Sequence, residues 1–207
     1  MSRKRIINGN QYGDYPLLEY DGVNPGYYQI ILDKMVERLE FMLERHSQVL
    51  VVRLVVRFPV EVTANADNDC FQYFMEEYRR HLKIKDFDPQ YVWVREQASS
   101  HNPHYHVLLL LNGNKIRYYR YPARANEIWS GALLKYYGYD CRGDGLIEVC
   151  SASYDGIAMN HGILLNRNNE TLTQEAYRIC SYLAKTNTKG NAPKNIREFG
   201  ASILGRG

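Results

Sequence analysis

Segments with helical and strand periodicity alternate along the chain, and their order restricts the fold more than any other feature of the sequence. Apolar residues recur at helical spacing over residues 27–46, and the β-branched run over 49–59 is typical of a buried strand. The same reasoning predicts a helix over 71–82, strands over 91–97, 104–111 and 146–150, and helices over 126–137 and 171–187, the last capped by Thr171 or Thr173. Between the first and last helices the order is therefore strand-helix-strand-strand-helix-strand.

This order predicts an α+β fold with a ferredoxin/RRM-like central antiparallel sheet (βαββαβ). We expect helices on one face and the active site on the other, plus an N-terminal helix and a C-terminal tyrosine-bearing helix. A chain of 207 residues suits one such domain. We expect an irregular N-terminal extension over 1–25, the main domain over 26–190 and a basic C-terminal tail over 191–207.

The composition, with 45% hydrophobic and 24% charged residues, excludes wholesale disorder and the collagen-like and coiled-coil classes. Residues 104–207 contain 13 Lys and Arg against 8 Asp and Glu, so the second half is basic. The four cysteines form no CxxC pair, and no segment has the length and apolar character of a membrane span. We therefore expect reduced thiols, no membrane anchoring and a cytoplasmic location.

The strongest candidate site lies in YVWVREQASSHNPHYHVLLLLNGN, residues 91–114. Side chains alternate along a strand, so His104 and His106 point the same way. If ASSHNP closes an antiparallel hairpin, Glu96 falls opposite His104 or His106, and either pairing places its carboxylate on the histidine face. Two nitrogens and one oxygen suit Mn²⁺, Mg²⁺, Fe²⁺ or Zn²⁺ with coordination positions left open for a substrate. Gln97 faces away and His101 lies in the loop.

A second set of candidate residues lies in the last predicted helix, which contains TQEAYRICSYLAKTNTK. At about 100° per residue, a core stripe is formed by Leu172, Ala176, Ile179 and Leu183. Tyr182 lies at the edge of this stripe, beside the cations Arg178, Lys185 and Lys189, where positive charge would stabilise its phenolate. Tyr177 projects roughly opposite the core. Tyr182 is therefore the candidate nucleophile.

The chain resembles the HUH endonucleases, which are named for two histidines around a hydrophobic residue. The resemblance is carried by the segment REQASSHNPHYHVLLLL followed later in the chain by YLAK. The resemblance covers residues 49–189 and is to the replication initiators (Rep) of rolling-circle plasmids and of filamentous (inovirus-type) phages and their prophage relatives. One departure is Tyr105, which is bulkier and more polar than the usual aliphatic residue between the histidines.

The resemblance implies that Glu96, His104 and His106 hold a divalent metal, Mn²⁺ or Mg²⁺. It also implies that Tyr182 is the nucleophile and that Lys185 positions or stabilises the phosphate. Some families use two tyrosines, so Tyr177 is a candidate second nucleophile. Its offset turns it about 140° away from Tyr182, which favours a single-tyrosine mechanism.

The implied activity is metal-dependent nicking and joining of single-stranded DNA at an origin. Attack by the tyrosine leaves a covalent 5′-phosphotyrosine and a free 3′-OH that primes rolling-circle replication. The implied partners are single-stranded or hairpin origin DNA and a host helicase and polymerase in a bacterial cytoplasm. Because the sequence has no P-loop or helicase segment, duplex opening must come from supercoiling or from a host helicase. The sequence leaves the oligomeric state open.

The segment KIRYYRYPAR, residues 115–124, interleaves cations with tyrosines. Cations meet phosphates and rings stack on unpaired bases, so the pattern is typical of a single-strand DNA grip, although a solvated hairpin with packed tyrosines is an alternative. The predicted DNA contacts are Lys115, Arg117, Tyr118, Tyr119, Arg120, Tyr121, Arg124, Arg178 and Lys189. We expect the N-terminal RKR and the C-terminal cations Lys194, Arg197 and Arg206 to be flexible basic ends.

Other function classes stay open from the sequence. One is a catalytically silent DNA-binding regulator on the same scaffold, although a pure binder has no need for all five site residues. Another is a metal-dependent nuclease that uses water, and a third is a two-histidine, one-carboxylate iron oxygenase. The oxygenase triad usually requires far more strand content. A covalent protein–DNA adduct discriminates among these classes.

Overall fold

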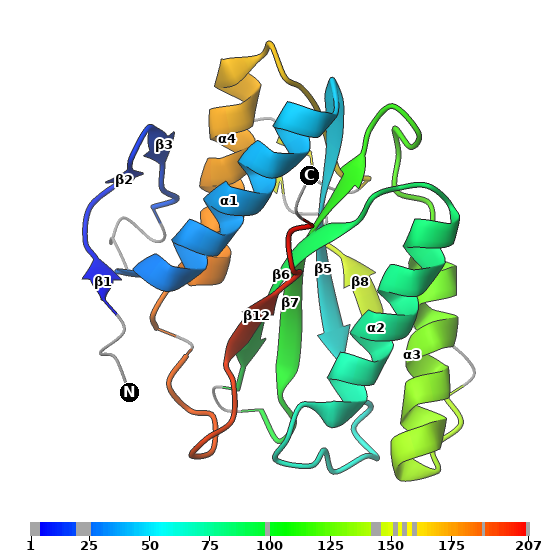
Figure 1. The fold of residues 1–207 in the computed structure, drawn as a ribbon. Coiled ribbons are helices and arrows are strands. Elements are labelled where there is room, and N and C mark those ends of the chain that lie inside the picture. Colours follow the sequence, from blue (N-terminus) through cyan, green and yellow to red (C-terminus); the bar gives the residue numbers. More distant parts are fainter. Residues whose placement is uncertain are drawn as a thin grey trace.

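The computed structural model describes residues 5–19, 26–97, 100–141, 146–150, 153–154, 157–158, 161–187 and 189–205. Within these ranges the chain forms an α+β fold with four helices and a six-stranded antiparallel sheet (Figure 1). The helices are α1 (Gln29–Arg45), α2 (Asp69–Ile84), α3 (Pro122–Tyr137) and α4 (Glu170–Cys180), and the 3₁₀ turn η1 (Ser181–Ala184) follows α4. The strands are β5 (Gln48–Arg57), β6 (Gln90–Glu96), β7 (His104–Asn112), β8 (Ile147–Val149), β11 (Ile163–Asn166) and β12 (Phe199–Ala201).

The chain order β5-α2-β6-β7-α3-β8 agrees with the order predicted from periodicity. Within the sheet the strand order is β11-β5-β7-β6-β12, and β8 shares the outer edge of β5 with β11. Every pairing in this sheet is antiparallel. The long central strands β5 and β7 are almost wholly buried, because helices cover both of their faces.

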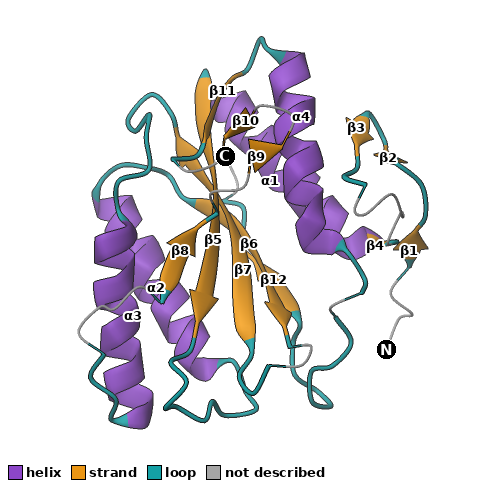
Figure 2. Ribbon diagram, turned by 180° about the vertical axis from the view of Figure 1, so that it is seen from behind, coloured by secondary structure: helices purple, strands orange, loops and turns teal. Residues whose placement is uncertain are grey.

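Alternating side chains of β5 and β7 supply two separate cores, one on each face of the sheet. Helices α2 and α3 cover one face, as expected for the two crossover helices, while α1 and α4 lie on the other (Figure 2). The face expected to carry the active site is therefore covered in part by the N-terminal helix α1 and by α4.

Several short strands were not predicted from the sequence. The segment expected to be irregular contains β1 (Ile6–Ile7), β2 (Gln11–Tyr12) and β3 (Tyr15–Pro16), and β4 (Tyr27–Tyr28) precedes α1. A further hairpin joins β9 (Ser153–Tyr154) to β10 (Ile157–Ala158). Strands this short have too few residues for an alternating pattern, so periodicity cannot find them.

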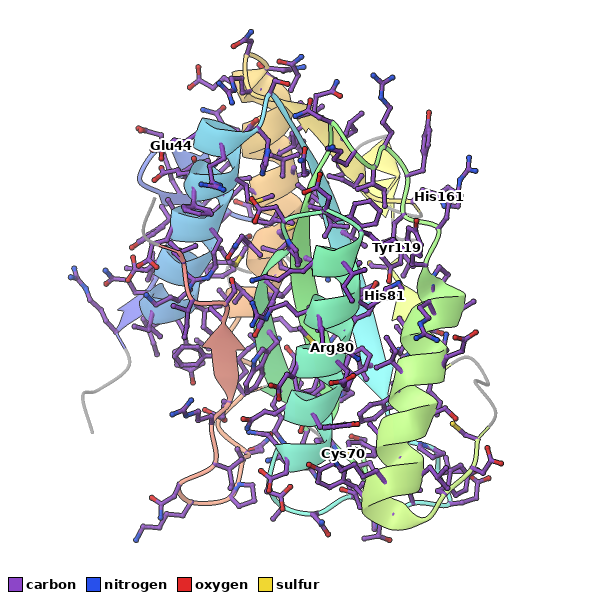
Figure 3. The ribbon with its side chains drawn as sticks, turned by 45° about the vertical axis from the view of Figure 1, so that its right-hand side comes forward. Glu44, Cys70, Arg80, His81, Tyr119 and His161 are labelled. Atoms are coloured by element: carbon purple, nitrogen blue, oxygen red, sulfur yellow. The ribbon has the colours of Figure 1, made fainter. Side chains whose placement is uncertain are left out.

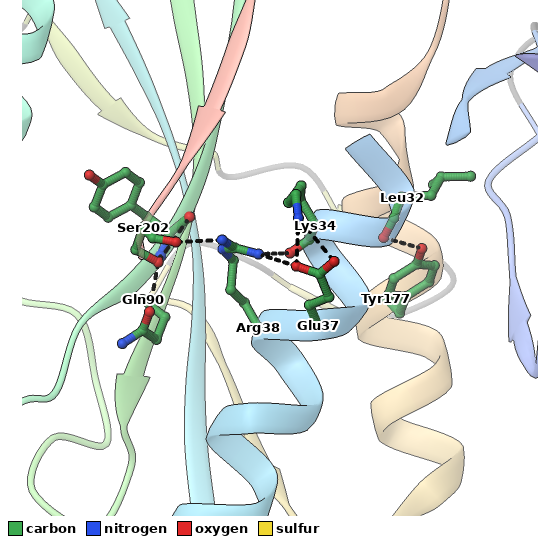
Figure 4. A network of polar contacts seen from close by, with 8 residues as sticks. Leu32, Lys34, Glu37, Arg38, Gln90, Tyr177 and Ser202 are labelled. Atoms are coloured by element: carbon green, nitrogen blue, oxygen red, sulfur yellow. Dashed lines mark hydrogen bonds and ion pairs between the residues drawn. The ribbon is translucent and has the colours of Figure 1, made fainter. Parts of the chain in front are cut away.

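Residues expected to be a C-terminal tail contribute the edge strand β12, which pairs with β6. Gly200 allows this close approach, because a Cβ there would lie 2.6 Å from the Trp93 ring. Beyond the strand, Ser202 donates a hydrogen bond to Gln90 Oε1 at 2.6 Å and accepts one from Arg38 at its carbonyl oxygen (Figure 4). The boundaries expected at residues 25 and 190 stay predictions.

The four cysteines are free thiols, as expected, and three of them are buried. No helix in the described part of the chain combines the length and the apolar character that a membrane span requires.

Candidate active site

The β6–β7 hairpin brings three metal-ligating side chains to one face of the sheet. Glu96 is the last residue of β6 and His104 is the first of β7, and the register pairs these two residues directly. His106, two positions along β7, points to the same face because side chains alternate. The sequence left open whether Glu96 falls opposite His104 or His106, and the structure selects His104.

The three side chains converge on a single point. Oε2 of Glu96 lies 3.7 Å from Nε2 of His104 and 3.4 Å from Nε2 of His106. One ligand atom from each residue can be chosen so that all lie within 4.8 Å of one another. The prediction that these residues form a candidate metal site is confirmed at this level, while the identity of the metal is a separate question.

The second oxygen of Glu96 is held by a buried lysine. Nζ of Lys189 lies 2.8 Å from Oε1 of Glu96 and also donates to the carbonyl oxygen of Lys185 at 2.9 Å. Burial alone would raise the pKa of Glu96, but interactions with the two histidines and the charge of Lys189 hold that pKa well below its usual range. Lys189 was expected to contact DNA, yet its side chain is fully buried in this pair.

Burial lowers the pKa of His106, although the nearby Glu96 carboxylate opposes this effect. A lower pKa keeps the imidazole neutral, and the neutral ring is the form that binds a metal. The chemistry of the donor set therefore fits a divalent cation.

The turn η1 carries Tyr182 to the metal-ligand group. The rings of Tyr182 and His106 are roughly perpendicular, with 6.3 Å between their centroids. Nζ of Lys185 lies 3.5 Å from the centroid of the same ring, and the guanidinium carbon of Arg53 lies 5.2 Å from it. The structure thus brings together the five residues that the sequence singled out for catalysis and adds Arg53, which the sequence reasoning missed.

Tyr182 was expected within a continuous helix over 171–187, but α4 ends at Cys180. The 3₁₀ turn that follows has a different rotation per residue, so helical azimuths do not apply beyond that point. The N-cap of α4 is Asn169, whose side chain accepts a hydrogen bond from the Leu172 amide at 3.0 Å. Neither Thr171 nor Thr173 is the cap.

The N-terminal segment anchors the turn that carries Tyr182. Ser181, the first residue of η1, accepts a hydrogen bond from the Leu18 amide at 2.9 Å and donates one to the Arg178 carbonyl at 2.7 Å. The Thr186 amide donates to the carbonyl oxygen of Gly26 at 3.1 Å. Residues expected to be irregular therefore help to fix the position of the candidate nucleophile.

Tyr177 does not project away from the core, as the sequence analysis expected, but is buried between α4, α1 and β3. Its ring packs against Tyr15 with 4.4 Å between centroids, and its hydroxyl donates to the Leu32 carbonyl oxygen at 3.4 Å (Figure 4). Burial raises its pKa well above the usual range. The N-terminal segment covers the side of α4 that a two-layer fold would expose. The structure gives no support to a second nucleophile at this position.

The basic segment 115–124 lies at the opposite end of the sheet from Glu96. At about 3.3 Å per residue, β7 separates the two by roughly 26 Å. Figure 3 shows Tyr119 at the far end and Cys70, at the start of α2, toward the site end.

Several side chains of this segment are engaged within the protein. Tyr119 is buried, with its hydroxyl 2.5 Å from that of Tyr78, and Tyr121 packs against the same core. Lys115 pairs with Asp86 at 2.8 Å, and Arg124 pairs with Glu127 at 2.6 Å. Among the predicted DNA contacts in this segment, the exposed residues are Arg117, Tyr118 and Arg120, together with the ion-paired Lys115 and Arg124. Arg178, on α4, pairs with Glu175.

Two of the C-terminal cations that were expected to be flexible, Lys194 and Arg197, lie at the end of the sheet that carries Glu96. The carbonyl oxygen of Arg197 accepts a hydrogen bond from Asn68 Nδ2 at 2.9 Å, and Asn191 donates to the Gln97 carbonyl oxygen at 3.0 Å. Lys194 and Arg197 are exposed on this anchored segment. Arg206, Arg3 and Lys4 lie outside the described residues.

Comparison with known proteins identifies one family. The model of the YagK/YfjJ C-terminal domain matches residues 17–202. No curated protein sequence matches the chain. Among solved structures, the catalytic domain of the Adeno Associated Virus type 5 Rep protein is similar over 58% of this chain and 77% of that one, with 11% identity and a TM-score of 0.30. This overlap is too weak to support an argument about activity, which has to come from the site itself.

Proposed function

The chain belongs to the YagK/YfjJ C-terminal domain family, and we propose that it is a metal-dependent endonuclease that nicks and rejoins single-stranded DNA through Tyr182. The observation that carries the proposal is the placement of the Tyr182 ring 6.3 Å from that of His106, beside the group formed by Glu96, His104 and His106. A tyrosine, a lysine and a His-His-Glu group at one end of a sheet form the set that the HUH endonucleases use.

The topology is consistent with the same superfamily. Strands β8, β5, β7 and β6 lie side by side in the order 4-1-3-2 when numbered along the chain, with α2 and α3 on one face. We infer that this part of the sheet is ferredoxin-like. Strands β11 and β12 and helices α1 and α4 are additions around it.

The metal that we propose for the site is Mn²⁺ or Mg²⁺, held by Oε2 of Glu96 and by the two histidines. When bound, it supplies Lewis-acid polarisation of the scissile phosphate and neutralises charge on the departing 3′ oxygen. The protein contributes a fixed carboxylate and a neutral imidazole at His106.

In the proposed reaction the Tyr182 hydroxyl oxygen attacks phosphorus in line with the departing 3′ oxygen. The bond between Tyr182 Oη and phosphorus forms as the bond between phosphorus and O3′ breaks. The phenol loses one proton and the 3′ oxygen gains one, so the step balances without a co-reactant. Lys185, 3.5 Å from the ring centroid, holds positive charge beside the groups on which negative charge develops.

The biological role that follows is initiation of rolling-circle replication. The 3′-OH would prime a host polymerase, and the phosphotyrosine would preserve the phosphodiester energy for rejoining. The proposed substrate is single-stranded or hairpin origin DNA in a bacterial cytoplasm, and a host helicase would open the duplex. Phage, plasmid and prophage elements use this strategy.

The test mixes purified protein with Mn²⁺ and a pool of labelled single-stranded oligonucleotides and looks for label that stays on the protein in a denaturing gel. Tyr177→Phe is the matched control, because it removes one hydroxyl from a tyrosine on the preceding helix. We expect the adduct in the wild type and in Tyr177→Phe, and none in Tyr182→Phe or with EDTA.

Other outcomes identify the alternatives. An adduct that is lost only in Tyr177→Phe would reassign the nucleophile. Shortened DNA without an adduct would indicate water as the nucleophile, and DNA that is bound but never cut would indicate a regulator.

A further inference from the structure

Arg53 is a buried arginine in the middle of β5, a strand that is otherwise aliphatic between its ends. In the register of the sheet it faces Leu108, and Val55 faces His106. Directly paired residues project to the same face, and positions two apart on a strand also share a face. Arg53 therefore points to the face that carries the metal-ligand group.

Among the described residues, the side chain of Arg53 makes one hydrogen bond that is long and has one buried donor without a partner. Nη1 makes a long hydrogen bond, 3.4 Å, to the carbonyl oxygen of Ile179 near the end of α4. Among the residues that the structure describes, Nε has no partner. A guanidinium offers five N–H donors, and a buried cation without a counterion is unfavourable. The hydrogen bond to the Ile179 carbonyl oxygen, near the end of α4, uses one of these donors.

Among the residues that the structure describes, buried cations outnumber buried carboxylates around Arg53. Arg53 and Lys185 both lie within 5.2 Å of the Tyr182 ring centroid, and Lys189 lies close by on Glu96. All three cations are buried, and Glu96 is the buried carboxylate among them. Lys189 already neutralises Glu96. The buried Arg53 guanidinium beside the ring, with its unpartnered Nε, suits an anionic ligand with several acceptor oxygens, and a phosphate group has this chemistry.

We propose that Arg53 is a phosphate-binding catalytic residue beneath Tyr182. This inference rests on the proposed function, in which the bound phosphate is the one that is transferred to Tyr182. The Nε–H group of Arg53 donates to a non-bridging oxygen while the bond to Tyr182 Oη forms and the bond to O3′ breaks. Arg53 keeps all its protons throughout, so it stabilises charge and takes no part in proton transfer.

Arg95 provides a matched control for substitution of Arg53. It is also a buried arginine of the sheet with an unpartnered Nε, but it pairs with Tyr105 in the register and so faces the opposite core. Its Nη1 donates to the Ala66 carbonyl oxygen at 2.9 Å. Arg53→Met and Arg95→Met remove the same atoms from two side chains that are buried to a similar degree. Urea unfolding of both variants therefore shows whether a change in phosphate binding results from lost stability alone.

The first measurement uses ³¹P NMR to monitor the binding of inorganic phosphate to the metal-free protein. We expect Arg53→Met to weaken phosphate binding by tenfold or more, Arg53→Lys to restore part of it and Arg95→Met to leave it unchanged. Equal binding by Arg53→Met and the wild type would overturn the assignment whether or not the protein cuts DNA.

The second measurement is the rate of adduct formation on an oligonucleotide that the wild type cuts. We expect Arg53→Met to lower this rate by about 10²- to 10³-fold, as for loss of one oxyanion donor. Replacing one non-bridging oxygen of the scissile phosphate by a methyl group gives two stereoisomers. For the isomer that lacks the oxygen bound by Arg53, the replacement should slow the wild type far more than it slows Arg53→Met. If the replacement slows both proteins by the same factor for both isomers, Arg53 does not contact a non-bridging oxygen. If phosphate binding depends on Arg53 but no oligonucleotide forms an adduct, the proposed nicking fails and the anion site stands.

Discussion

Nζ of Lys189 lies 2.8 Å from Oε1 of Glu96, and the other oxygen of that carboxylate faces the two histidines. Both side chains are buried. The carboxylate is therefore shared between an ammonium group and the candidate metal site. A fixed partner on one oxygen limits rotation of the carboxylate, so Lys189 acts as a positioning residue for Glu96.

Breaking this pair should destabilise the metal-free protein strongly. Lys189→Met and Glu96→Gln each leave a buried charge without its partner, so each should cost about 3–5 kcal/mol in the free energy of unfolding. The double variant should lose clearly less than the sum, as measured by urea denaturation. The exposed pair of Lys115 and Asp86 is the control, since Lys115→Met should leave the free energy of unfolding almost unchanged. Additive losses in the double variant would show that the two groups are not coupled.

Metal binding should depend on all three converging side chains. Removing one of three protein ligands by Glu96→Gln, His104→Gln or His106→Gln should weaken Mn²⁺ binding by at least about 100-fold, as measured by titration calorimetry. His101→Gln is the matched control, because His101 lies in the same hairpin but outside the ligand group, 3.3 Å from Thr63 Oγ1. Equal affinity for His101→Gln and His106→Gln would place the metal elsewhere.

The two glycines Gly200 and Gly131 should respond to alanine in opposite ways. In Gly200→Ala the new methyl group meets the Trp93 ring, so β12 has to shift and the protein should lose about 1–3 kcal/mol of stability. Gly131 is exposed within α3, and a Cβ there meets nothing within 4 Å. Gly131→Ala should therefore gain up to about 1 kcal/mol. Thermal unfolding of both variants tests the placement of β12, and a neutral Gly200→Ala would contradict it.

Stability should decrease in alkaline solution because of two buried thiols. Burial raises the pKa of Cys70 and of Cys180 from 9.0 to about 12. Between these values the unfolded chain releases protons that the folded protein keeps, so the stabilising contribution is complete below pH 9 and is lost as pH rises toward 12. The expected slope is roughly 1 kcal/mol per pH unit for each thiol. Urea unfolding between pH 8 and 10.5 should show a shallower slope for Cys70→Ala/Cys180→Ala, and equal slopes would refute the assignment.

Local patterns were sufficient where neighbouring residues decide the structure. The alternation over 104–111 and the proline and turn residues before it predicted a hairpin with Glu96 and both histidines on one face. Periodicity also located the four helices and the four strands of the central unit, because each of these elements is long enough to repeat its pattern. Of the two registers allowed for Glu96, the assembled sheet selected one.

The same reasoning failed where a second layer covered a surface. Helical geometry placed Tyr177 on the exposed side of its helix, but the N-terminal segment and α1 bury that side. The geometry was also extended past Cys180, where the helix gives way to a 3₁₀ turn. Nothing in the local pattern reports which side of a helix a distant segment will cover.

By itself, the sequence determined which residues could share a face of the β6–β7 hairpin, because strand alternation acts over two residues. Tertiary structure alone decided that Lys189 lies on Glu96, 93 positions away, and that Arg53 lies beneath Tyr182. Such contacts depend on how separate elements pack, and packing is a property of the whole core. The charge balance of the site, which among the described residues has three buried cations around one buried carboxylate, is therefore visible only in the folded chain.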